Sequence, residues 1–127
     1  MFLSRGYFRM QQQIFTCRYV YFNEVRHPVH WLRVDLAIAF LGPKQARLFR
    51  INSPFTVTVK PLVITRELEA LYDLYWNNIE FDAHYSVESC LMGGSTQTVF
   101  DTYVVEVRDR GNLIAAGIFD QIGRAHV

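Results

Sequence analysis

The clearest hydrophobic pattern in the chain lies between residues 65 and 79. Apolar residues recur there at positions i, i+3, i+4, i+7 and i+11, which predicts an amphipathic helix. The five positions are Leu68, Leu71, Tyr72, Tyr75 and Ile79. Thr65 precedes the pattern and can cap its first turn. A second, shorter helix is expected from Val87 to Met92, because Gly93-Gly94 is a typical helix end.

Alternation of apolar and polar residues predicts strands in the second half of the chain. Phe55 to Lys60 alternates at every position, as expected for a half-buried strand. Phe100 to Arg108 and Leu113 to Asp120 are two further strand candidates. They flank Asp109-Arg110-Gly111-Asn112, in which Gly and Asn tolerate the positive φ of a hairpin turn. These segments therefore predict a strand followed, after the helices, by a β-hairpin.

The first half of the chain is predicted to begin with an antiparallel pair of strands. Gln11 to Phe22 is rich in Ile, Phe, Val and Tyr, which favours a strand. Asn23 to Pro28 is typical of a turn, and Val29 to Leu36 follows as the second strand candidate. In that second strand Arg33 and Asp35 share one face.

A short basic helix is predicted between Gly42-Pro43 and Asn52-Ser53-Pro54, since proline suits a first helical turn. Its buried side is expected to consist of Leu48, Phe49 and Ile51. Lys44, Arg47 and Arg50 recur at every third position. An exposed basic face of this kind can bind RNA phosphates with release of counterions. The alternative is an ordinary solvated helix face.

The composition fits a packed domain, because half of the residues are hydrophobic and 15% are aromatic. The predicted elements indicate an α+β or α/β fold with a largely antiparallel sheet and flanking helices. The longest apolar run, Leu36 to Leu41, is much shorter than the roughly 18 residues of a membrane helix, so no membrane association is predicted. There are only two cysteines, Cys17 and Cys90, and they lie far apart in sequence, so neither a disulfide framework nor a metal ribbon is indicated and a reducing, cytoplasmic setting is favoured.

Charge is distributed unevenly along the chain. Residues 1–60 carry nine Lys or Arg and two acidic residues, whereas residues 61–121 carry three Arg and ten acidic residues. A basic half suggests a polyanionic partner. Mutual neutralisation of the two halves within the fold is the alternative.

The last six residues are expected to lie outside the native domain. Ile122-Gly123-Arg124-Ala125-His126-Val127 resembles one translated reading frame of a common sequencing adapter. We therefore assign residues 1–121 to the domain and exclude His126 from catalysis. A natural short tail is the alternative.

Several landmarks occur in an order that is similar to a known enzyme family. They are Gly6-Tyr7-Phe8-Arg9-Met10-Gln11, Trp31-Leu32-Arg33-Val34-Asp35-Leu36, the basic helix Lys44…Asn52, the helix Ile64-Thr65…Glu69…Leu71-Tyr72…Tyr75, and the hairpin Phe100…Asp120. Their order over nearly all of residues 5–121 resembles the arginyl-tRNA–protein transferases and their bacterial leucyl-transferring relatives. The resemblance implies an acetyltransferase-like (GNAT-like) catalytic half, here incomplete at its C-terminus. It also implies transfer of an aminoacyl group, arginyl or leucyl, from charged tRNA to the N-terminal amine of an acceptor protein. This activity is expected of the full-length enzyme, and the incomplete fragment is expected to be inactive alone.

Under this resemblance we expect Lys44, Arg47 and Arg50 to bind tRNA. Arg9 and Arg33 are candidates for binding the acidic N-terminus of the acceptor, because a guanidinium presents a bidentate fork to carboxylates. Pairing with Asp35 or Glu24, or plain exposure on a sheet face, is the alternative. Asp101 and Asp120 are candidates for holding or deprotonating the acceptor amine, and turn or cap roles are the alternative.

Other chemistries find less support in the sequence. His27 and His30 have no third ligand at a suitable spacing, so no metal site is predicted, and no cofactor motif is found. An acyl-CoA N-acyltransferase remains an alternative, although residues 1–121 show no cradle for a pyrophosphate. A non-catalytic module that binds RNA or protein is the other alternative.

Overall fold

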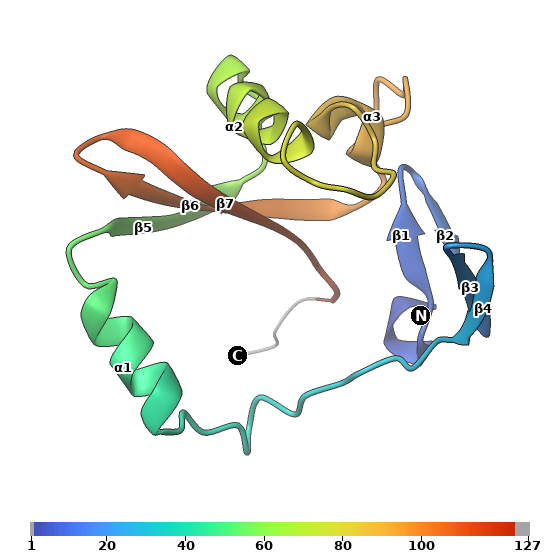
Figure 1. The fold of residues 1–127 in the computed structure, drawn as a ribbon, viewed down its shortest axis with the longest axis horizontal. Coiled ribbons are helices and arrows are strands. Elements are labelled where there is room, and N and C mark those ends of the chain that lie inside the picture. The colour runs from blue at the N-terminus through green and yellow to red at the C-terminus, as the bar shows by residue number, and fades with distance from the viewer. Residues whose placement is uncertain (1, 124–127) are drawn as a thin grey trace.

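The computed structural model describes residues 2–123 and has a mixed α+β fold with antiparallel sheets (Figure 1). The largest sheet has the order β5-β6-β7, formed by Thr56–Pro61, Asp101–Asp109 and Asn112–Gln121. Helices α2 (Arg66–Trp76) and α3 (Val87–Leu91) lie on one side of this sheet. The predicted fold class is therefore confirmed at this level.

The β6–β7 hairpin forms where the sequence predicts it. Its turn contains Arg110 with φ 50° and Gly111 with φ 85°, and Asp109 pairs with Asn112 on either side. Two consecutive residues with positive φ give a turn whose twist matches the flanking strands. The register shifts between Val107 and Arg108, which indicates a β-bulge in the hairpin.

The core lies between this sheet and the two helices. Val104 of β6, Leu68 of α2 and Val87 of α3 are exposed by only 1%, 5% and 4%. Glu106 of β6 is also buried and lies on the same face as Val104, because side chains alternate along a strand. The opposite face of the sheet is open, since Val57 and Val59 of β5 are more than half exposed.

Helix α2 begins as predicted, because the Thr65 hydroxyl accepts a hydrogen bond of 3.1 Å from the Leu68 N–H. It ends at Trp76 with Asn77 as the cap, before the predicted Ile79. Helix α3 ends at Leu91 and is followed by Gly93 and Gly94, both with positive φ, as expected from the sequence.

The first half of the chain differs from the prediction. Gln11 to Phe22 is not one strand, because the chain forms two separate hairpins. The first pairs β1 (Phe8–Met10) with β2 (Gln13–Phe15), and the second pairs β3 (Tyr19–Phe22) with β4 (Val25–Pro28). Asn23 and Glu24, with φ of 48° and 63°, complete the second turn in two residues. The predicted turn over residues 23–28 was therefore too long.

The predicted strand Val29 to Leu36 was wrong, because this segment pairs with no strand within residues 2–123 and forms part of the long connection to α1. Trp31 anchors its start, with its ring centroid 4.4 Å from that of Phe8. Helix α1 (Pro43–Ile51) has the predicted bounds. Its predicted buried side was wrong, because Leu48, Phe49 and Ile51 are exposed by 56%, 64% and 57%. No helix among the described residues has the length and apolar character needed to cross a bilayer.

Candidate functional site

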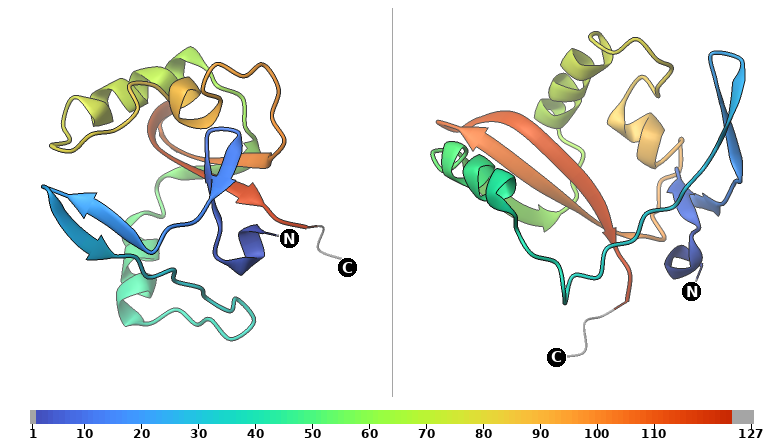
Figure 2. Two further views of the ribbon diagram at one scale, coloured as in Figure 1. Left: turned by 90° about the vertical axis from the view of Figure 1, so that its right-hand side faces the viewer. Right: turned by 60° about the horizontal axis from the view of Figure 1, so that its bottom comes forward.

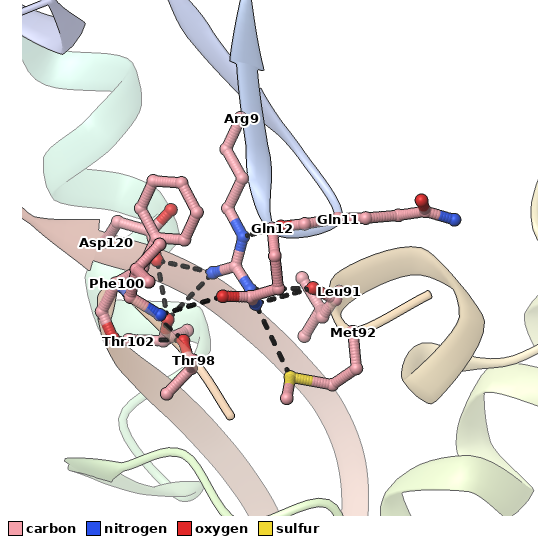
Figure 3. A network of polar contacts seen from close by, with 10 residues as sticks. Arg9, Gln11, Gln12, Leu91, Met92, Thr98, Phe100, Thr102 and Asp120 are labelled. Carbon is pink, nitrogen blue, oxygen red and sulfur yellow. Dashed lines mark hydrogen bonds and ion pairs between the residues drawn. The ribbon is translucent and has the colours of Figure 1, made fainter. Parts of the chain in front are cut away.

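Arg9 is the centre of a polar network that joins β1 to the sheet and to α3 (Figure 3). Its Nη1 donates to the Asp120 carboxylate at 2.7 Å and to the Thr102 hydroxyl at 2.8 Å. Its Nη2 donates to the carbonyl oxygen of Leu91 at 2.9 Å. The guanidinium also lies 4.4 Å from the ring centroid of Phe100, within the range of a cation–π interaction.

The Asp120 carboxylate is engaged from two sides. The Thr102 hydroxyl, which accepts from Arg9, donates to Asp120 Oδ1 at 2.7 Å. The side chains of Arg9 and Asp120 are exposed by only 8% and 19%. In this shielded ion pair each side chain neutralises the charge of the other. The pair therefore attaches the β1–β2 hairpin to the end of β7.

Gln11 and Gln12, in the turn between β1 and β2, extend the same network. The Gln12 amide donates to the Leu91 carbonyl at 2.9 Å and accepts from the Val99 N–H at 2.8 Å. The Gln11 amide donates to the Ser89 carbonyl at 3.2 Å. Neither residue was predicted from the sequence, because glutamine in a turn carries no pattern that reveals its distant partners.

Asp101 lies at the same end of the sheet but outside the network. It pairs with Gln121 across β6 and β7, next to the Thr102–Asp120 pair. Its side chain is exposed and borders an open pocket of about 410 Å³ that also includes Gln12, Phe100 and Gln121. Within residues 2–123 the Asp101 carboxylate has no hydrogen-bond or ion-pair partner. It is therefore free to meet a cationic or amine ligand.

The remaining candidates lie apart from Arg9. Arg33 is not on a strand, and it donates a long hydrogen bond of 3.4 Å to the Ser4 carbonyl. Lys44, Arg47 and Arg50 are all exposed on α1, at the opposite side of the molecule from β1 in Figure 1. None of these three cations forms an ion pair with another described residue. The structure thus groups Arg9, Asp101 and Asp120 and separates Arg33 and the α1 cations from them.

A second charged cluster connects α2 to the sheet, and sequence reasoning did not single it out. Arg108 donates to both Glu67 oxygens at 2.8 Å and to Glu106 at 3.1 Å, and Lys60 lies 2.9 Å from Glu106. The hydrogen bond from Arg108 lowers the pKa of Glu67. The hydrogen bond from Lys60, followed by that from Arg108, lowers the pKa of Glu106, and these carboxylates in turn raise the pKa of Arg108. Since its members neutralise one another beneath α2, this cluster is structural.

Comparisons with known proteins leave the assignment open. No protein-family model matches the chain, and no curated protein or solved structure is significantly similar to it. Within residues 2–123, His, Cys, Asp and Glu side chains do not converge in groups of three that would hold a metal ion. The functional interpretation therefore depends on the geometry and on the resemblance described above.

Proposed function

We propose that this chain belongs to an aminoacyl-tRNA–protein transferase-like enzyme, which in its full-length form moves an arginyl or leucyl group from charged tRNA to a protein N-terminus. The observation that carries the proposal is the exposed face of Lys44, Arg47 and Arg50 on α1, none of which has an anionic partner among the described residues. Unpaired cations along one helix are suited to RNA phosphates, because each contact releases condensed counterions.

The distribution of charge supports an RNA substrate. Four acidic residues of the second half form ion pairs among the described residues: Glu67, Glu106, Asp109 and Asp120. Of the nine cations in the first half, only Arg9 and Lys60 form ion pairs within residues 2–123. Mutual neutralisation of the two halves is therefore incomplete, and the surplus positive charge is available to a polyanion.

The antiparallel β5–β6–β7 sheet with α2 and α3 on one face is compatible with the expected acetyltransferase-like architecture. In the proposed reaction the acceptor amine attacks the aminoacyl ester, an amide bond forms, and the ribose hydroxyl of tRNA leaves. The attacking amine must be neutral, so a nearby carboxylate that accepts its proton assists the reaction. Asp101 fits this role better than Asp120, because its carboxylate is exposed beside a pocket whereas Asp120 is held by Arg9. Arg9 and Arg33 are retained as candidates for acceptor binding.

One specific observation favours a second candidate function, a non-catalytic RNA-binding module. Arg9 and Asp120 satisfy each other, so two of the four proposed acceptor-side residues are occupied by a structural contact. The basic face of α1 is the same under both hypotheses. The two functions therefore differ in the reaction and not in RNA binding.

A transfer assay with charged tRNA tests the proposal. The full-length gene product is incubated with arginyl-tRNA or leucyl-tRNA and with peptides that begin with Asp, Glu or Ala. Transfer to a peptide amine, abolished by Asp101→Asn, supports the enzyme. Binding of tRNA without transfer selects the RNA-binding module, and absence of both binding and transfer at low salt rejects the proposal.

A further inference from the structure

The β3–β4 hairpin is exposed over its whole length. All four residues of β3 and all four of β4 are exposed. Figures 1 and 2 show the hairpin standing apart from the β5–β6–β7 sheet. An isolated two-stranded hairpin is only marginally stable in water, so a surface of this kind gains stability when it binds a partner.

One face of the hairpin combines two aromatic rings with a cation. Tyr21 pairs with Arg26 and Tyr19 pairs with Pro28 across the antiparallel strands. Paired residues, and those two positions further along a strand, point to the same face, so Tyr19, Tyr21 and Arg26 lie together. The Arg26 guanidinium lies 4.6 Å from the ring centroid of Tyr19. Tyr21 beside it is 74% exposed, which leaves its ring open to a ligand.

The cation and the exposed aromatic ring of this face are suited to an anionic ligand that also carries a planar group. Arg26 has no ion pair within residues 2–123, and the only acidic residue of the hairpin is Glu24, which lies in the turn. A nucleotide offers both a phosphate for the guanidinium and a base for the tyrosine ring. Only an unpaired nucleotide exposes its base in this way, because bases in a duplex are stacked on each other.

We propose that the Tyr19–Tyr21–Arg26 face of β3–β4 binds unpaired nucleotides of RNA, with a base stacked on Tyr21 and a phosphate at Arg26. This inference extends the proposed function, because it adds a contact for a single-stranded part of the RNA to the phosphate contacts of α1. The two surfaces have different preferences. The side chains of α1 contact RNA phosphates, which are present in single-stranded and duplex RNA alike, whereas the hairpin requires an unpaired base.

Fluorescence anisotropy with two labelled probes tests the inference at low salt. The probes are a single-stranded oligoribonucleotide of about ten nucleotides, within the usual site size, and an RNA duplex of the same length. Tyr21→Ala is expected to weaken binding of the single strand by about 5-fold to about 150-fold and to leave duplex binding unchanged. Tyr21→Phe, which keeps the ring, is expected to bind as the wild type does. Tyr85→Ala is the matched control, because Tyr85 is similarly exposed, at 68%, but lies before α3.

The outcomes separate this inference from the proposed function. If Tyr21→Ala binds the single strand like the wild type, while loss of the α1 cations abolishes RNA binding, the hairpin inference is overturned and the proposed function stands. A face that binds a protein in place of RNA gives that same result. If Tyr21→Ala weakens binding of the single-stranded probe but no aminoacyl transfer from charged tRNA is detected, the hairpin inference stands and the proposed transferase activity is rejected. If neither probe binds the wild type, both the hairpin inference and the RNA contact of α1 are rejected.

Discussion

Arg9 and Asp120 lie 111 positions apart in the chain, yet their side chains meet at 2.7 Å. Arg9 reaches Asp120 from β1, and Thr102 of β6 bridges the two through its hydroxyl. One side chain thus joins the first hairpin to the last strand, and the same guanidinium also holds the carbonyl that ends α3. The stability of the whole domain should depend on this contact.

Replacement of Arg9 should destabilise the fold strongly. Arg9→Ala leaves the shielded Asp120 carboxylate without its counter-charge and the Leu91 carbonyl without its donor. We expect the free energy of unfolding to fall by about 2–4 kcal/mol, as measured by urea denaturation. Arg110→Ala is the control, since that side chain is 93% exposed. Equal stability of the two variants would contradict a structural role for the pair.

The Glu106 cluster should make stability depend on pH in the acidic range. Lys60 and Arg108 hold the pKa of Glu106 below its ordinary value of 4.5. Its ionised form therefore stabilises the folded state above that pH, and this contribution is lost as the pH falls through the lower, folded value. Urea midpoints measured from neutral pH down to about pH 3 should fall less steeply for Glu106→Gln than for the wild type. The exposed Glu80→Gln should retain the wild-type slope, and parallel curves for Glu106→Gln would refute the linkage.

Glu69 of α2 should control the order of α3. Its carboxylate accepts the Val87 and Glu88 N–H groups, each at 2.9 Å, and so caps the first turn of that helix. Glu69→Ala should cost about 1–3 kcal/mol, because it removes two hydrogen bonds to a charged acceptor. Hydrogen exchange of the α3 amides should accelerate in this variant and not in Glu80→Ala. The Ser86 hydroxyl also caps α3, because it accepts a hydrogen bond of 2.9 Å from the Ser89 N–H. Unchanged protection of Val87 would show that this cap is sufficient.

The basic face of α1 should determine how RNA binding depends on salt. A variant with Lys44, Arg47 and Arg50 all replaced by Ala should bind tRNA more weakly, and the slope of log K against log salt should decrease by about 3. The control replaces Arg5, Arg66 and Arg110, which are exposed, lie outside α1 and carry the same total charge. If both triple variants lose affinity equally, net charge and not α1 accounts for binding.

The sequence predicted the elements whose signals are local. Helix α2 and the β6–β7 hairpin formed as expected, because the Thr65 cap and the Arg110-Gly111 turn are set by neighbouring residues. Val29 to Leu36 forms no strand although its residue pattern predicts one. Its alternation is suited to a strand, but a strand also requires a partner, and whether one is present depends on tertiary structure.

The candidate site was predicted only in part. Arg9 and Asp120 were singled out separately, each for a role with substrate, and their mutual contact was not foreseen. The alternative for Arg9 and Arg33 was pairing with Asp35 or Glu24, and neither of these carboxylates forms an ion pair within residues 2–123. Contacts over a long separation, such as those of Gln12 with Leu91 and Val99, leave no trace in the local pattern.

The contact between Arg9 and Asp120 also has a consequence for the order of folding. The β6–β7 hairpin forms by local loop closure, whereas this contact closes a loop of almost the entire chain. Because the loss of conformational entropy is larger for the long loop, we expect the contact to form late in folding. An interaction formed after the transition state acts on the unfolding rate alone. We therefore expect loss of the ion pair to raise the unfolding rate, and so to shorten the lifetime of the native state, while the folding rate stays unchanged.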